Sequence, residues 1–281
     1  MKQTAPPALA EFTPPVAGTL SPRLPLRGWA LELARRWNGG TYSLFILHGN
    51  IYDIFPVQEG AENAFVPLKT FLARRIFPER SFLLFYDIGD GLSFGSADMQ
   101  KRFFSWLKVY DEVEGTSFHQ QGPPRDFIKL ALLLRRFFLR IADEKREGIS
   151  LIIDFPEKII PEGDSYSSQD ERTALVTLLK WAASPEMRRL DVGIFLVTET
   201  AAKLSADLLL NPHVAQIKIE LPDAEDRVRF LESSTIKALV EGKPLAEWSD
   251  FQSEDLANRL SGLNLLRIQH LLAEAVRNGS R

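Results

Sequence analysis

The chain has 281 residues, of which 45% are hydrophobic and 25% are charged, and this composition is typical of a globular protein. Its formal net charge of -3 argues against a polyanion-binding protein, so nucleic acid is not the expected partner. The complete absence of cysteine excludes disulfides, thiolate zinc sites and cysteine nucleophiles, and it fits a reducing cytoplasm.

The first segment, residues 1–27, is rich in proline and small residues and lacks the long apolar stretch of a signal peptide. We expect it to form a flexible arm ahead of the folded part. No run in the chain reaches the roughly 20 apolar residues that a bilayer span requires, so a membrane is not an expected partner.

Short apolar runs recur along the chain, separated by stretches with helical periodicity. The runs are 43–49, 82–88, 149–155, 193–199 and 215–221. The first four are almost continuously apolar, as expected for strands buried on both faces of a parallel sheet. The fifth alternates, with Ile217 and Ile219 on one side and Lys218 and Glu220 on the other, which indicates an edge or half-covered strand.

The stretches around these runs predict helices. They cover residues 29–37, 67–77, 97–110, 125–145 and 170–183. The helix over 125–145 is apolar nearly all round, so we expect it in the core rather than at a subunit contact. Alternation of strand and helix predicts an α/β domain over 28–222. After Pro222 only helical patterns remain, which predicts a helical lid subdomain over 223–281.

Four segments carry a family resemblance. They are LIIDF, GIFLVTET, IKIELPDAEDRVRFLES and LANRLSGLNLLRIQHLLAEAV. Together they resemble the AAA+ ATPase module over roughly residues 28–279. The stretch HGNIYD further resembles the degenerate N-terminal AAA+-like module of bacterial tandem AAA-family ATPases. The resemblance implies a five-stranded parallel P-loop-NTPase-like sheet flanked by helices, a small helical lid, oligomeric assembly, and ATP with Mg as the cofactors of the family.

The loop after the first strand departs from the chemistry of a phosphate loop. A phosphate loop follows G-x-x-x-x-G-K-[ST], in which backbone N–H groups and a lysine hold the phosphates and a hydroxyl holds Mg. Gly49 is followed directly by Asn50, Ile51, Tyr52 and Asp53, without the second glycine, the lysine or the hydroxyl. Asp53 instead places negative charge roughly where phosphate would lie. We favour a simple turn, in which Gly49 allows positive φ, over a remodelled ligand loop that uses His48 or Asp53.

The resemblance also identifies the other ATPase positions. Asp154 matches the magnesium-binding aspartate, but Phe155 stands where the water-orienting glutamate is expected, and Glu157 should point elsewhere beyond Pro156. Thr198 matches the polar sensor residue. The segment LLLNPHVAQIKI offers no arginine for the trans-acting position. An arginine finger alone is worth about 10³–10⁵ in rate, so the losses together argue against hydrolysis by this chain.

We therefore expect a module without catalytic residues or a cofactor of its own. Gly49, Asn50, Asp154 and Thr198 would be vestigial nucleotide-site positions. The expected role is structural, regulatory or partner-binding within a larger ATP-dependent remodelling ATPase, with a protein partner or a sister AAA+ module. Two alternatives stay open: an ATP-binding module with a non-standard phosphate loop, and an interaction scaffold without ATPase context. The histidines show no metal-ligand spacing, so no metal site is expected.

Overall fold

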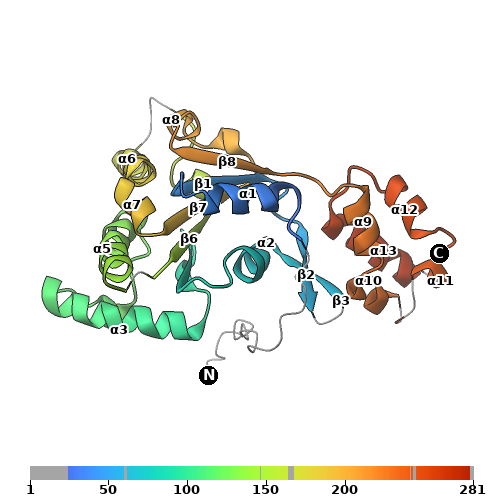
Figure 1. The fold of residues 1–281 in the computed structure, drawn as a ribbon, viewed down its shortest axis with the longest axis horizontal. Helices are drawn as coiled ribbons and strands as arrows, with labels where there is room; N and C mark the ends of the chain where they lie inside the picture. The colour runs from blue at the N-terminus through green and yellow to red at the C-terminus, as the bar shows by residue number, and fades with distance from the viewer. Residues whose placement is uncertain are drawn as a thin grey trace, which may run out of the picture.

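The computed structural model describes residues 25–59, 62–145, 147–163, 168–240, 242 and 245–278 (Figure 1). Residues 1–24, which make up most of the predicted arm, lie outside this description. The last residues of that arm are described, and Leu26 packs against a buried apolar cluster of the α/β part. The folded part therefore includes a contact from residues just before Gly28.

A six-stranded sheet forms the centre of the α/β part, in the order β5-β4-β6-β7-β1-β8. Its strands are β1 (Leu44–Gly49), β4 (Phe82–Asp87), β5 (Gly91–Phe94), β6 (Ile149–Asp154), β7 (Val192–Thr198) and β8 (Val214–Ile219). The five apolar runs of the sequence are the five strands that pair in parallel. The predicted edge strand, β8, lies at one end of the sheet and has an alternating burial pattern.

The prediction of five strands was wrong by one, because β5 adds an antiparallel strand beside β4. A tight turn connects the two strands: the Asp87 carboxylate accepts hydrogen bonds from the N–H groups of Gly89 and Asp90, at 2.9 and 2.8 Å. Gly91 follows with φ 82°, a conformation that glycine adopts without strain. Strand β5 has only four residues, which is too short for an alternation signal in the sequence.

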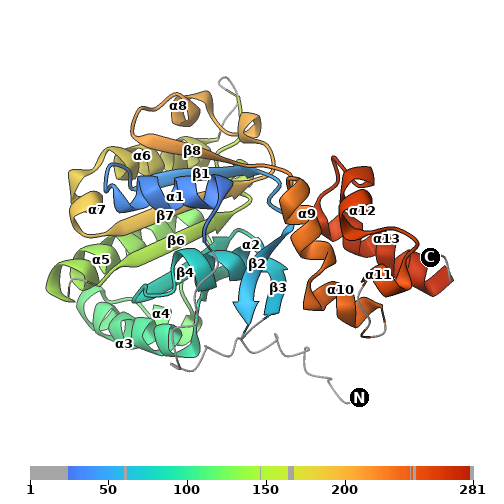
Figure 2. The ribbon, with the colours of Figure 1, turned by 45° about the vertical axis from the view of Figure 1, so that its right-hand side comes forward.

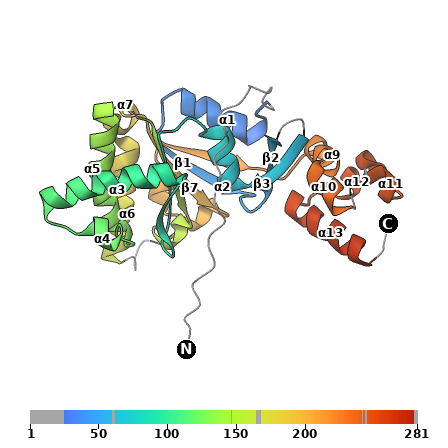
Figure 3. The same ribbon diagram turned by 90° about the horizontal axis from the view of Figure 1, so that it is seen from below.

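Helices cover both faces of the sheet, so the architecture has three layers (Figures 1 and 3). Side chains of β1 alternate between the two apolar clusters: Leu44 and Ile46 face one, and Phe45 and Leu47 face the other. The first cluster contains α3 (Ala97–Glu114), α5 (Phe127–Lys145), α6 (Gln169–Ala183) and α7 (Pro185–Arg189). The second contains α1 (Gly28–Asn38) and α2 (Leu68–Phe71).

Helix α5 is a core helix, as the sequence predicts. Its buried residues in the first cluster are Phe127, Leu130, Ala131, Leu133, Leu134, Phe137, Phe138 and Ile141. Short elements complete this part of the chain. They are α4 (Phe118–Gln121), the 3₁₀ turns Pro156–Lys158 and Ala201–Lys203, and α8 (Ala206–Leu209).

A β-hairpin between β1 and α2 was not predicted. It consists of β2 (Ile54–Glu59) and β3 (Glu62–Pro67). Its alternation gives it two apolar faces: Phe55 and Val57 pack against the α/β part, whereas Ile54 and Phe65 pack against the C-terminal helices. The hairpin therefore lies between the two parts of the protein (Figure 1). The helix predicted over 67–77 is correspondingly shorter, with one turn of α2 followed by a π-helical segment at Leu72–Ile76.

The C-terminal helices form a separate lobe with its own apolar cluster (Figure 2). They are α9 (Ala224–Leu231), α10 (Ser234–Leu239), α11 (Leu245–Trp248), α12 (Ser253–Arg259) and α13 (Leu265–Asn278). Asp223 caps α9 by accepting a hydrogen bond from the Asp226 N–H at 2.8 Å. Arg227 is buried and donates to the carbonyl oxygens of Pro222 and Ala257, at 2.6 and 2.7 Å, which fixes α9 against α12.

Candidate functional site

The carboxyl ends of β6, β7 and β1 meet at one edge of the sheet, because these strands are parallel neighbours. His48 of β1 pairs in register with Thr198 of β7, and Asp154 of β6 pairs with Val197. This edge therefore brings together Gly49, Asp154 and Thr198, with Asn50 following Gly49. Sequence reasoning placed these four positions at strand ends, and the fold gathers them.

Three backbone N–H groups at the start of the loop after β1 donate within the protein. The Gly49 N–H donates to the Glu199 carbonyl at 3.1 Å, the Asn50 N–H to the Ile219 carbonyl at 2.9 Å, and the Ile51 N–H to the Gly49 carbonyl at 2.8 Å. The loop continues into strand β2, and no helix begins there. The segment Gly49 to Phe55 thus forms no ring of amides at a helix N-terminus, which agrees with the simple turn favoured from the sequence.

Gly49 is required by the closeness of β8. Its φ is 103°, a conformation that side chains rarely tolerate. A Cβ added at Gly49 would lie 2.5 Å from the carbonyl oxygen of Ile219. The glycine therefore lets the end of β1 turn closely against β8 before the chain enters the hairpin.

Asp53 ties this loop to the helical lobe. Its side chain is only 2% exposed. The Oδ1 atom accepts hydrogen bonds from the Ile54 N–H and from the Leu266 N–H, both at 2.9 Å, and Oδ2 accepts from the Asn50 side chain at 2.7 Å. Leu266 lies in the first turn of α13, so a carboxylate from the α/β part occupies the positive end of a lobe helix.

A lysine that sequence reasoning missed faces Asp154. Lys69, the second residue of α2, places its Nζ atom 3.1 Å from Asp154 Oδ2. Burial raises the pKa of Asp154, Lys69 opposes that shift, and Asp87 adds to it. The sequence feature that could have pointed to this lysine is the pair Lys69-Thr70 at the start of a predicted helix. Only the hairpin, however, brings that pair back to the carboxyl edge of the sheet.

Glu157 and Thr198 also meet at this edge. The Thr198 hydroxyl donates to Glu157 Oε2 at 2.9 Å, and Thr198 is almost fully buried. The expectation that Glu157 points elsewhere therefore needs a correction: the 3₁₀ turn after Phe155 directs its carboxylate to the end of β7. Phe155 itself adopts φ 52°, which is uncommon for a bulky residue.

A cleft of about 260 Å³ opens beside the ion pair of Lys69 and Asp154. Its lining is mostly apolar, with Ile51, Tyr52, Asp53, Pro67, Leu68, Lys69, Leu72, Ile152, Asp154, Phe155 and Val197. Tyr52 is 56% exposed and Phe155 is 45% exposed, so two aromatic rings face solvent at the cleft. Burial raises the pKa of the Tyr52 hydroxyl, and the nearby carboxylates of Glu199, Glu157 and Asp154 raise it further.

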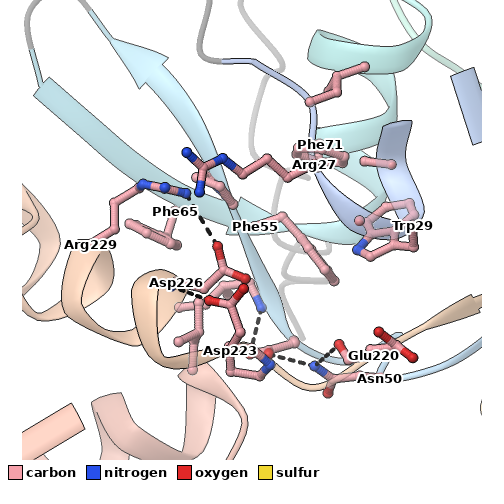
Figure 4. Close-up of a pocket in the computed structure, with 18 of the residues that line it drawn as sticks. Arg27, Trp29, Asn50, Phe55, Phe65, Phe71, Glu220, Asp223, Asp226 and Arg229 are labelled. Carbon is pink, nitrogen blue, oxygen red and sulfur yellow. Dashed lines mark hydrogen bonds and ion pairs between the residues drawn. The ribbon is translucent and has the colours of Figure 1, made fainter. Parts of the chain in front are cut away.

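A second cavity, of about 170 Å³, lies between residues 25–30, the hairpin and α9 (Figure 4). Trp29, Phe55 and Phe71 form an aromatic group there, with ring centroids 5.4–5.5 Å apart. Arg229 pairs with Asp226 at 3.3 Å within α9. Arg27, which precedes α1, pairs with Glu225 of α9. Burial and the neighbouring Asp223 raise the pKa of Asp226, which Arg229 opposes.

Two kinds of site are missing from the part of the chain that the structure describes. No three metal-ligating side chains come together there as a possible metal site. No helix there combines the length and the apolar character that crossing a membrane demands.

Comparisons with known proteins give two family matches. Residues 18–220 match the model described as "AAA+ chaperone, N-terminal Rossmann-like domain", and residues 225–281 match "AAA+ chaperone, second helical domain". A search of curated proteins returned no match. Among solved structures, one similar chain belongs to the "Structure of E. coli MS115-1 HORMA:CdnC:Trip13 complex". The identity is 16% and the TM-score 0.46, over 79% of this chain and 60% of that chain. The present chain thus corresponds to less than two thirds of that chain's length.

Proposed function

The chain belongs to the AAA+ chaperone family, and from this premise we propose that it is a non-hydrolysing AAA+ module. In this proposal it contributes assembly surface or partner binding to a larger ATP-dependent remodelling ATPase, together with a protein partner or a sister AAA+ module. Its setting would be an oligomer in the bacterial cytoplasm, and the cysteine-free sequence supports a reducing compartment. We also propose the division at Pro222 into an α/β domain, 28–222, and a lid, 223–281.

The closed loop after β1 is the observation that carries the proposal. A phosphate loop holds an anion because its N–H groups point at an empty space. The N–H groups of Gly49, Asn50 and Ile51 all donate to carbonyl oxygens of the protein itself. A triphosphate would have to break these bonds and approach the buried carboxylate of Asp53. Both requirements oppose binding.

The rest of the edge supports the same conclusion. Hydrolysis needs a group that orients water, and the residue after Asp154 is the apolar Phe155. Glu157 is engaged by the Thr198 hydroxyl. We therefore assign no catalytic residue. We propose that four positions are vestiges of a nucleotide site: Gly49, Asn50, Asp154 and Thr198. In this proposal the module itself uses neither ATP nor Mg.

The second candidate function is ATP binding through a non-standard loop, and Lys69 favours it. A lysine in the first turn of a helix, next to an aspartate at a strand end, supplies a cation and a magnesium ligand of the kind that bound triphosphate uses. The Lys69–Asp154 pair leaves this cation partly neutralised, which is why we rank this candidate second.

A titration with fluorescent ATP and Mg separates the two candidates. The non-hydrolysing module should show no saturable, Mg-dependent binding in the micromolar range, and Lys69→Ala and Asp154→Ala should change nothing. Micromolar binding that both substitutions abolish would establish the second candidate instead. A competent AAA+ module added in trans then tests the partner role, which predicts a change in that module's turnover or assembly.

A further inference from the structure

The chain passes from the α/β part to the helical lobe through residues 220–223, between β8 and α9. A lobe on such a connection is expected to move relative to its neighbour, unless a large apolar interface holds it. Three other segments of the α/β part contact the lobe as well. They are the segment before α1, the loop after β1, and the hairpin of β2 and β3.

The hairpin divides its side chains between the two parts of the protein. Ile54 of β2 and Phe65 of β3 pack in the apolar cluster of the lobe. Val57 and Val66, from the same two strands, pack in the second cluster of the α/β part. The Phe65 ring meets the buried Phe230 ring of α9 edge to face, with centroids 4.8 Å apart (Figure 2). The hairpin therefore belongs to both cores.

Polar contacts hold the same joint. The Ser234 hydroxyl of α10 donates to the Asn63 carbonyl oxygen of β3 at 3.0 Å. The Leu266 N–H of α13 donates to the buried carboxylate of Asp53 at 2.9 Å. Arg27, in the segment before α1, forms an ion pair with α9. Three segments of the α/β part thus reach three different helices of the lobe.

A rotation of the lobe about residues 220–223 would break these contacts together. It would bring Ile54 and Phe65 into water, which is unfavourable for apolar side chains. It would also separate the Asp53 carboxylate from the Leu266 N–H, and a buried polar group without its partner is costly. The apolar and the polar contacts therefore oppose the same motion.

We infer that the hairpin fixes the helical lobe on the α/β part, so that the lobe is a rigid extension and not a lid that opens and closes. The hairpin follows β1, at the place where a phosphate loop would continue into a helix. One insertion thus replaces the phosphate loop and immobilises the lobe. A fixed lobe presents the helices of both parts to a partner in one constant geometry. This inference goes beyond the proposed function, because it holds with or without a partner.

Pulsed electron resonance between two spin labels measures the position of the lobe directly. The chain has no cysteine, so two introduced cysteines carry the labels. Arg35→Cys in α1 and Glu274→Cys in α13 are both at exposed positions. A fixed lobe should give one narrow distance distribution, and saturating ATP with Mg should leave it unchanged. A second distance in the protein alone, or a shift with nucleotide, would overturn the inference.

Two variants of the labelled protein test the hairpin as the cause. Phe65→Ala and Ile54→Ala remove side chains that face the lobe, and each should widen the distance distribution about twofold or more. Leu178→Ala is the matched control, because it removes a buried side chain of the first cluster, which the hairpin does not join. It should lower stability and leave the width unchanged. Hairpin variants as narrow as the parent, or a control that widens equally, would contradict the inference.

Urea unfolding of the parent chain gives a test that needs no variant to fold. With 5-fluorotryptophan incorporated, fluorine NMR observes Trp248 in the lobe and Trp181 in the α/β part. The two native resonances should disappear at the same urea concentration, because the shared hairpin couples the two cores. In Phe65→Ala the Trp248 midpoint should fall below that of Trp181 by about 0.5 M or more. An earlier loss of Trp248 in the parent would show a lobe that unfolds alone, which contradicts the inference.

Failure of the fixed lobe and failure of the proposed function give different results. Mg-dependent ATP binding with an unchanged label distance contradicts the proposed function and agrees with the fixed lobe. A wide or double distance distribution without ATP binding contradicts the fixed lobe alone. A distance that shifts as ATP binds contradicts both.

Discussion

Asp53 offers the sharpest test of how the two parts of the protein are joined. In Asp53→Ala the N–H groups of Ile54 and Leu266 lose their acceptor in a buried place. Each unsatisfied buried donor costs about 1–3 kcal/mol, so we expect a loss of unfolding free energy of about 3 kcal/mol. In Asp53→Asn the side-chain oxygen still accepts both bonds, whereas the bond from the Asn50 side chain to Oδ2 and the negative charge at α13 are lost, which together cost about 1–2 kcal/mol.

Urea denaturation and amide hydrogen exchange measure the two consequences separately. Asp53→Ala should lower the unfolding midpoint and should increase exchange at the Leu266 amide, whereas Asp53→Asn should do little to that amide. Asp250→Ala, an exposed carboxylate of the helical lobe, is the control and should change neither quantity. If Asp53→Ala matched Asp53→Asn in stability and left Leu266 protected, the carboxylate would not be what joins the loop to α13.

The remaining predictions concern the same edge of the sheet. Gly49→Ala should destabilise the protein by about 2 kcal/mol or more in a urea titration, because its Cβ would meet the Ile219 carbonyl at a positive φ; unchanged stability would contradict the assigned geometry. Asp154→Asn should keep or raise the melting temperature at pH 7, because burial raises the pKa of Asp154 and the folded state favours its neutral form; a clear fall would mean that the Lys69 pair outweighs burial. His48 has a pKa lowered from 6.5 by burial and Lys218, so the unfolded chain binds more protons; stability should fall as pH drops below about 6.5, and His48→Gln should flatten that fall.

The parallel strands were predictable because their chemistry is local. Strands such as β6 and β7 are covered on both faces, so nearly every residue is apolar, and that pattern is readable without knowing the neighbours. The parallel arrangement was implied by the family resemblance, and the edge position of β8 was indicated by the alternation of Ile217 and Ile219 with Lys218 and Glu220.

The hairpin escaped prediction for a physical reason. Strand β2 contains Pro56, which is rare inside strands, and its two apolar faces belong to different clusters. Its apolar pattern therefore lacks the simple one-sided alternation of a strand on a single core. Missing the hairpin also hid Lys69, because only the hairpin returns the chain to the end of β6.

The closeness of Glu157 to Thr198 escaped prediction as well. It depends on the left-handed conformation of Phe155, a residue type that gives no sign of positive φ in the sequence. Similarly, the sequence indicated only that Asp53 places a negative charge where a phosphate would lie, and it did not indicate the structural role of this residue. Its acceptor role toward Leu266 joins residues that are far apart in the chain, and such contacts are beyond local sequence patterns.

The amides of Gly49, Asn50 and Ile51 all donate to carbonyl oxygens of the protein, so we expect them to have no capacity left for a triphosphate. An NMR titration of the isotope-labelled protein with ATP and Mg observes those amides directly. We predict that the amide resonances of Gly49, Asn50 and Ile51 stay in place at saturating nucleotide. Saturable shifts of these three resonances, together with a shift of the Lys69 side chain, would contradict it.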